Sequence, residues 1–187
     1  MQLFNSYRAL SRGITACNTV IGQSLGWLTV AMVIITAAIV VARTVFNVGS
    51  VGSQELVTYL HAFVIMGASA YTLASNEHVR VDIFYRHLNR PQQAWVDLVG
   101  SLLLLLPFAL VTALISWNFV MNAWALHETS ADSGGLPFVY LLKSLLLVNG
   151  VLLALQALAE ALRHLVTIAQ GDVIHQKDAK PKENQHA

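Results

Sequence analysis

Four ionisable residues occur within the ten positions of the stretch SNEHVRVDIF, residues 75–84, although the chain as a whole carries little charge. They are Glu77, His78, Arg80 and Asp82. Carboxylates and a histidine at this density could form a general acid–base pair, a metal site or a cofactor site. They could equally be the water-exposed end of a segment that is otherwise buried in lipid.

The spacing in this stretch favours an interfacial helix over a reactive site. In a helix, His78, Asp82 and Arg86 lie four residues apart and share one polar face, with Asp82 placed to pair with Arg86. Apolar residues fall on another face, as in a helix that lies in the membrane interface. The sequence also has no H-E-x-x-H zinc motif, phosphate-binding loop, G-x-S-x-G or C-x-x-C. We therefore predict no enzymatic activity, no cofactor and no metal site.

The composition is that of a membrane protein. Of the 187 residues, 56% are hydrophobic and 11% are charged, against about a quarter charged in ordinary soluble domains. A formal net charge of +1 gives no electrostatic footprint for nucleic acid. Cys17 is the single cysteine, which excludes an internal disulfide and a cysteine-based metal site.

Four apolar runs are each long enough to cross a hydrocarbon layer of roughly 30 Å as helices. They predict spans at about residues 20–42, 56–74, 97–122 and 137–162. Continuous apolar runs favour helices, whereas a membrane β-barrel needs alternating segments of about ten residues. We expect an all-α integral membrane protein, with one four-helix domain at residues 1–165 and a disordered cytoplasmic tail at 166–187.

The distribution of lysine and arginine predicts the orientation of these spans. Nine of these residues precede the first span, lie between the second and third, or follow the fourth, whereas Arg43 and Lys143 lie on the other side. An excess of positive charge marks the cytoplasmic side of a membrane protein. Both termini and the SNEHVRVDIF stretch are therefore expected in the cytoplasm.

Polar residues inside the predicted spans are few. Glu55 stands at the outer start of the second span, where a carboxylate favours the helix dipole and can also contact a partner. His61 is the only histidine in a span, so a bis-histidine haem site lacks a second ligand, and we expect a hydrogen bond to a neighbouring helix. Asn118 and Asn122 are expected to make bonds of the same kind.

Further candidate contacts lie near the ends of the spans. Gln156 and Glu160 share one face of the fourth span with His164 at spacing four. Gly67 begins the small-residue stretch Gly-Ala-Ser-Ala, which suits close helix packing. The outer loop HETSADSGG carries Glu128, and this loop is either a contact for a periplasmic partner or a flexible turn.

Several of these residues together resemble the small membrane subunit of tripartite ATP-independent periplasmic (TRAP) transporters. The most specific part is the sequence His78-Val-Arg-Val-Asp82, and Glu55 and Gly67-Ala68 fit the same family. The second half adds the sequences Glu128-Thr-Ser130, Gly135-Leu-Pro137, Lys143-Ser144 and Leu155-Gln156. The resemblance runs from the first span to about Arg163, and it departs from the family at Asn149-Gly150, where a Pro-Gly-like step is common.

The resemblance implies one part of a three-part importer. In that family a periplasmic binding protein delivers a small organic anion, often a carboxylate, to a large membrane subunit that translocates it with sodium. The small subunit would scaffold the large one in the bacterial inner membrane, with lipids and, transiently, the periplasmic protein as further partners. We expect the subunit or interface contacts to come from Glu55, Gly67, His78, Asp82, Arg86, Glu128, Gln156 and Glu160.

Two other functions stay open from the sequence. The chain could be a free-standing four-helix membrane adaptor that serves no transporter. It could also be a haem-binding membrane redox subunit, against which the single histidine within a span argues.

Overall fold

All of the regular secondary structure in the part that the structure, a computed structural model, describes is helical. The structure describes residues 2–75, 85 and 87–178, with the surroundings of side chains given for 9–75, 85, 87–89 and 91–169. Within these residues, four helices are long and apolar enough to span a membrane, at Ala9–Val45, Val51–Ala74, Pro91–Ala125 and Val139–Ala169. The predicted all-α fold with four spans is therefore confirmed.

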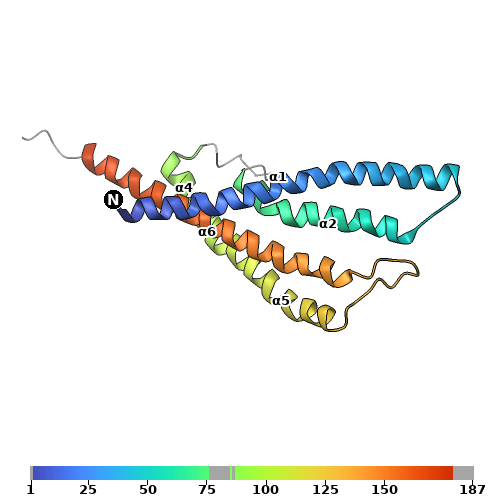
Figure 1. Ribbon diagram of the computed structural model, residues 1–187. Coiled ribbons are helices and arrows are strands. Elements are labelled where there is room, and N and C mark those ends of the chain that lie inside the picture. The colour runs from blue at the N-terminus through green and yellow to red at the C-terminus, as the bar shows by residue number, and fades with distance from the viewer. Residues whose placement is uncertain (1, 76–84, 86, 179–187) are drawn as a thin grey trace, which may run out of the picture.

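The helices form two hairpins that pack side by side. In chain order they are α1 (Gln2–Val45), α2 (Val51–Ala74), α4 (Arg90–Gly100), the π-helix η1 (Ser101–Leu105), α5 (Leu106–Ala125) and α6 (Val139–Asp178). Figure 1 shows α1 paired with α2 and α5 paired with α6, and the hairpins meet through α2 and α6. Because α6 also packs on α1 and α4, it is the central helix of the described chain. The start of α1 and the end of α6 lie at the same end of the molecule (Figure 1).

The helices extend beyond the spans predicted from hydropathy. The span at 20–42 lies inside α1, and the span at 137–162 begins just before α6 at Val139 and ends well before Asp178. Hydropathy marks only the part of a helix that suits hydrocarbon, whereas backbone hydrogen bonding continues into the flanking turns. The division into a domain at 1–165 and a tail at 166–187 stays a prediction, because α6 is helical to Asp178 and the last nine residues lie outside the described part.

A π-helical turn interrupts the third span. The amide of Leu106 donates to the carbonyl of Ser101, five residues earlier, and Pro107 follows directly. Proline has no amide hydrogen and its ring crowds the preceding turn, so the helix widens there rather than continuing as a regular α-helix. The distortion next to Pro107 takes the form of the turn η1, which joins the amphipathic helix α4 to the apolar helix α5.

Small residues allow the closest helix contacts. A β-carbon at Gly150 of α6 would lie 3.0 Å from both the carbonyl oxygen of Ala109 and the β-carbon of Ala113 on α5. Ala109 is fully buried, and together with Ala70 of α2 and Leu153 of α6 it forms a core cluster that joins three helices. These contacts depend on short side chains because two helix backbones can approach closely only where no large side chain intervenes.

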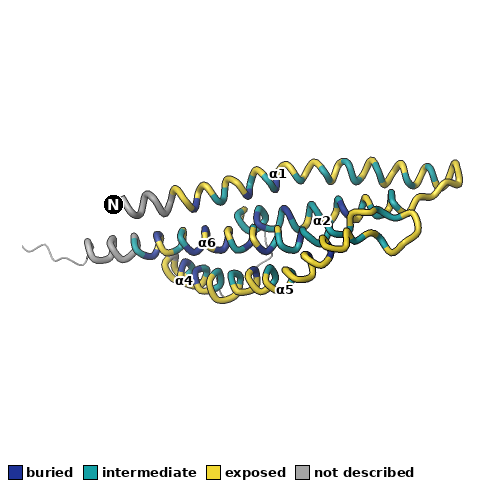
Figure 2. Tube along the Cα trace, turned by 60° about the horizontal axis from the view of Figure 1, so that its bottom comes forward, coloured by how far each residue is buried: buried dark blue, intermediate teal, exposed yellow. Residues whose placement is uncertain are grey.

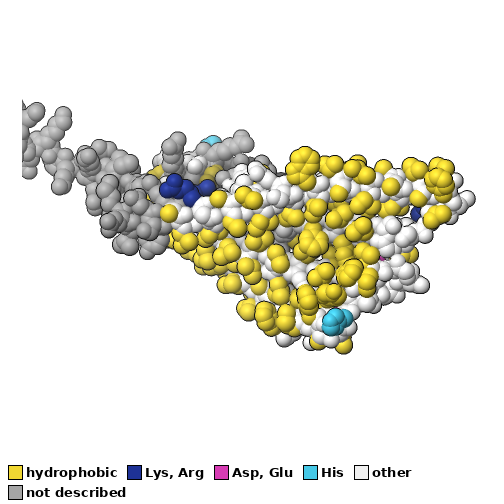
Figure 3. Space-filling model, in the orientation of Figure 1, with side chains coloured by type: hydrophobic (Ala, Val, Ile, Leu, Met, Phe, Trp, Pro, Cys, Tyr) yellow, Lys and Arg dark blue, Asp and Glu magenta, His cyan; other side chains and the backbone are white. Residues whose placement is uncertain are grey.

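Burial is concentrated on α6, and most of the remaining surface is apolar. Of the most apolar 18-residue stretch of each span, 44% is buried in α6, against 0% in α1, 17% in α2 and 11% in the third span. Figure 2 shows many exposed residues along α1 and α5, and buried ones along α6 and on the helices α2 and α4 that pack against it. Figure 3 shows hydrophobic side chains over most of one face, with lysine and arginine atoms near the end that carries the N-terminus. Such a surface requires lipid or a membrane partner.

Candidate functional site

A polar network joins α1 to α6 in the half of the molecule near the termini. The amide nitrogen Nδ2 of Asn18 donates to Oε1 of Gln156 at 2.9 Å. The Nε2 atom of Gln156 in turn donates to Oε1 of Glu160 at 3.1 Å and to the hydroxyl of Thr15 at 3.4 Å. Nearby, the hydroxyl of Ser11 donates to the carbonyl of Ala159 at 2.8 Å.

These network residues are buried within the chain. Gln156 is 0% exposed, Asn18 is 2% exposed and Glu160 is 6% exposed. In a low-dielectric interior each of these polar groups needs a partner, and here each finds one in the same chain. Gln156 and Glu160 were predicted as interface contacts, and that role stays a prediction. What the structure shows is that they tie α1 to α6 and extend the network along α6.

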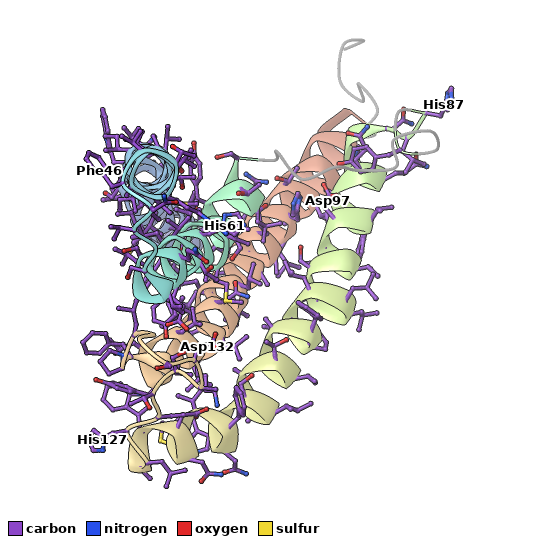
Figure 4. All side chains as sticks on the ribbon, turned by 90° about the vertical axis from the view of Figure 1, so that its right-hand side faces the viewer. Phe46, His61, His87, Asp97, His127 and Asp132 are labelled. Carbon is purple, nitrogen blue, oxygen red and sulfur yellow. The ribbon has the colours of Figure 1, made fainter. Side chains whose placement is uncertain are left out.

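The network continues from α6 to α4 through charged groups. Glu160 forms an ion pair with Arg163, and its Oε2 atom lies 3.4 Å from Nε2 of His164. The same His164 nitrogen lies 3.7 Å from Oδ2 of Asp97 on α4. Asp97, labelled in Figure 4, also accepts a hydrogen bond from the hydroxyl of Tyr85 at 2.7 Å. Together these contacts join Tyr85, α4 and α6. Asp97, Glu160 and His164 also line an open cavity of about 400 Å³.

Glu55 organises the opposite end of the molecule. Its Oε1 atom accepts a hydrogen bond from the hydroxyl of Ser130, and its Oε2 atom accepts one from the amide of Leu136 at 2.6 Å. The amide of Ser130 donates to the carbonyl of Leu136 at 3.1 Å, which closes the loop between α5 and α6. There is no room for a β-carbon at Gly135, because the Ser130 side chain and Glu55 occupy that space. Glu55 therefore clamps this loop onto α2.

Glu128 is held at the same end by a lysine. The Nζ atom of Lys143 lies 2.5 Å from Oε2 of Glu128 and 3.9 Å from the centre of the Phe119 ring. Cations favour such a position over the face of an aromatic ring. Nearby, Nε1 of Trp124 donates to the hydroxyl of Ser144 at 2.8 Å. The sequence predicts that the loop HETSADSGG is either a contact for a periplasmic partner or a flexible turn. Contacts within the chain hold the parts of this loop that bond to Glu55 and Lys143. A contact with a periplasmic partner stays a prediction.

Gly67 lies at a close contact between α1 and α2. A β-carbon there would overlap the Leu25 side chain, and one at Gly22 would overlap Tyr71. Gly67 is buried by this contact. The packing expected of the small-residue stretch is therefore present inside the chain, whereas the predicted contact of Gly67 with another subunit stays a prediction.

No described residue forms a hydrogen bond with the side chain of His61, which lies within the second span. The side chain, labelled in Figure 4, is exposed on α2. The expected hydrogen bond to a neighbouring helix is thus not formed within the described chain. Asn118 and Asn122 on α5 are exposed as well. No described residue bonds to their side chains, so the hydrogen bonds expected of them are not formed within the described chain either. Hydropathy counts a polar residue in a span but does not tell which side of the helix faces the protein.

His78, Asp82 and Arg86, with the predicted amphipathic segment between the second and third spans, lie outside the described residues. Their predicted interface role stays a prediction. Sequence reasoning missed Asn18, Ser130 and Asp97 as partners of Gln156, Glu55 and His164. Each pair is far apart in sequence, so no spacing rule connects its members.

The fold and these contacts define a class of protein: a four-span, all-α membrane protein whose outer surface is mostly apolar. Among its described residues, most buried polar side chains pair with one another, and the hydroxyl of Tyr59 is the exception. The particular family follows from comparison with known proteins. The family model described as "Tripartite ATP-independent periplasmic transporters, DctQ component" matches residues 32–167, so the chain belongs to this family of TRAP transporter small membrane components. The predicted resemblance is therefore confirmed. No curated protein and no solved structure matches the chain.

Proposed function

We propose that the chain is the small permease subunit of a TRAP transporter and scaffolds the large subunit that translocates substrate and sodium. The observation that carries this proposal is the family match, which covers most of the four-helix part of the chain. The transported solute would be a small organic anion, most simply a carboxylate, delivered by a periplasmic binding protein. The chain would lie in the bacterial inner membrane with both termini in the cytoplasm.

The arrangement of polar and apolar groups supports a scaffolding role. Four ionisable side chains near the two ends of the molecule have contacts within the chain: Glu55, Glu128, Glu160 and His164. Such contacts hold helices and loops in one arrangement instead of lining a path for an ion or a solute. The large exposed apolar faces of α1 and α5 are available to lipid and to a membrane partner. A rigid, largely apolar four-helix body is suited to fixing the stationary part of a transporter in the bilayer.

Reconstituted uptake tests this proposal. Proteoliposomes that contain the large subunit with the wild-type chain should accumulate the solute when the loaded binding protein and a sodium gradient are supplied. Vesicles that contain the large subunit alone should show no accumulation, because the translocating subunit lacks its scaffold. Equal uptake with and without the chain would contradict the proposal and favour a free-standing adaptor. A Soret absorption band in the purified chain would instead favour a haem-binding subunit.

A further inference from the structure

The second span is the least apolar of the four candidate spans, and it carries polar side chains on its exposed side. Among the four candidate spans, α2 has the lowest mean hydropathy, yet only 17% of its most apolar 18-residue stretch is buried within the chain. The central helix α6, which is more apolar, is 44% buried by the same measure. A membrane helix with polar residues usually directs them towards protein, because hydrocarbon cannot form hydrogen bonds with them. The exposed polar side of α2 therefore needs a cover that the described part of the chain does not supply.

The polar residues of α2 that are exposed lie along one stripe. Gln54, Thr58, His61 and Ile65 follow one another at spacings of four, three and four, which places them on one side of the helix, and all four are exposed. The hydroxyl of Thr58 is satisfied by the carbonyl of Gln54 at 3.3 Å. The ring of His61, by contrast, has no hydrogen-bond partner among the described residues. We call these four residues the α2 stripe.

The depth of His61 excludes an ordinary lipid-headgroup contact. It lies ten residues after Val51 in a helix of 24 residues, which is about 15 Å along a helix of about 36 Å. Since the hydrocarbon layer is roughly 30 Å thick, the ring stands well inside it. Asn118 and Asn122, by contrast, lie within about two turns of the end of α5 at Ala125, where headgroups and water can reach them.

We propose that the α2 stripe is a docking surface for a membrane-spanning helix of the large TRAP subunit, which presents a hydrogen-bonding side chain to His61. This inference rests on the proposed function, because the large subunit is the membrane partner that the family implies. Only a polypeptide can place a hydrogen-bond partner at this depth, since acyl chains have none. A neutral histidine has one donor and one acceptor nitrogen, so a hydroxyl, amide or carboxyl group on the partner helix fits it. Thr58 beside it is small enough for the partner helix to approach closely.

The test measures association of the full-length chain with the purified large subunit by energy transfer between labelled proteins in lipid vesicles. His61→Leu should weaken association by about threefold to about twentyfold, the range expected from the loss of one hydrogen bond within a membrane. His61→Gln, which keeps a donor and an acceptor, should restore most of the association. His87→Leu makes the same chemical change at an exposed position outside the spans, and it should bind as the wild type does.

Two further measurements separate the possible outcomes. His61→Leu should keep the thermal stability of the isolated chain, because the ring has no partner there to lose. A photo-crosslinking amino acid at Ile65 should form adducts with the large subunit. If the wild type binds and His61→Leu binds equally well, the docking surface is wrong while the proposed function stands. If the wild type does not bind, the proposed function itself fails. Energy transfer between two copies of the chain that depends on His61, without binding of the large subunit, would overturn the proposal in favour of self-association.

Discussion

The hydrogen bond between Asn18 and Gln156 gives the sharpest test of the packing between α1 and α6. Gln156→Ala removes the acceptor of the Asn18 amide at 2.9 Å and the donor to Glu160 at 3.1 Å. Gln156 also donates to the hydroxyl of Thr15 on α1 at 3.4 Å, so it makes two bonds to α1. Hydrogen bonds between membrane helices contribute about 0.6 kcal/mol on average, so these two bonds account for about 1.2 kcal/mol. The substitution also leaves the amide of Asn18, which is 2% exposed, without its acceptor. This adds to the cost, since a buried donor without a partner costs about 1–3 kcal/mol.

The expected loss of unfolding free energy for Gln156→Ala is therefore about 2–4 kcal/mol. At about 2–4 °C per kcal/mol for a chain of this size, the melting temperature should fall by about 4–16 °C. The assay is thermal and denaturant unfolding of the full chain in mild detergent, followed by circular dichroism. Ser24→Ala is the matched control, because its exposed hydroxyl bonds only to the carbonyl of Val20 in the same helix, and it should change stability by less than about 0.5 kcal/mol.

A double-mutant cycle isolates the single bond. Asn18→Ala, Gln156→Ala and the double substitution together should give a coupling energy of about 0.6 kcal/mol, with an upper bound of about 1.7 kcal/mol. If the two single substitutions are additive and each costs no more than Ser24→Ala, the two side chains do not stabilise the contact between α1 and α6. That result would refute the reasoning that the network holds α1 in place.

Three other substitutions probe the remaining contacts. Gly150→Leu should destabilise the chain by about 1–3 kcal/mol in detergent unfolding, because its side chain would enter the backbone contact with Ala109; a wild-type melting temperature would show that α5 and α6 do not cross there. Glu55→Ala should speed hydrogen exchange at the Leu136 amide, which loses its acceptor, and unchanged exchange would contradict the clamp. Tyr59→Phe should leave stability unchanged or slightly raised, because no described residue bonds to its buried hydroxyl; a loss above about 1 kcal/mol would reveal a partner such as a bound water.

The sequence predicts the helices well because apolar periodicity and length report directly on the lipid that surrounds them. Four spans follow from four apolar runs, and the distortion at Pro107 follows from the chemistry of proline. The ends of α1 and α6 were underestimated, since the flanking turns are too polar to register as membrane spans yet still form backbone hydrogen bonds.

The partners of polar residues are harder to predict from sequence than the helices. Gln156 and Glu55 were recognised as polar groups in unusual places, but their partners Asn18 and Ser130 are distant in the chain. Only the way the hairpins pack brings such pairs together. His61 shows the reverse problem: the sequence predicts a polar group that needs a partner, and the described chain leaves it exposed.

The most direct test of the central claim is the composition of the complex that forms around this chain. The tagged chain, with a mass of 20.4 kDa, is co-expressed with the large membrane subunit, extracted in mild detergent and weighed intact by native mass spectrometry. A subunit of a TRAP transporter should appear as a complex whose mass is the sum of the chain and one large subunit. A spectrum that contains only the chain or its own oligomers, from membranes that hold both proteins, would contradict the claim that it scaffolds the transporter.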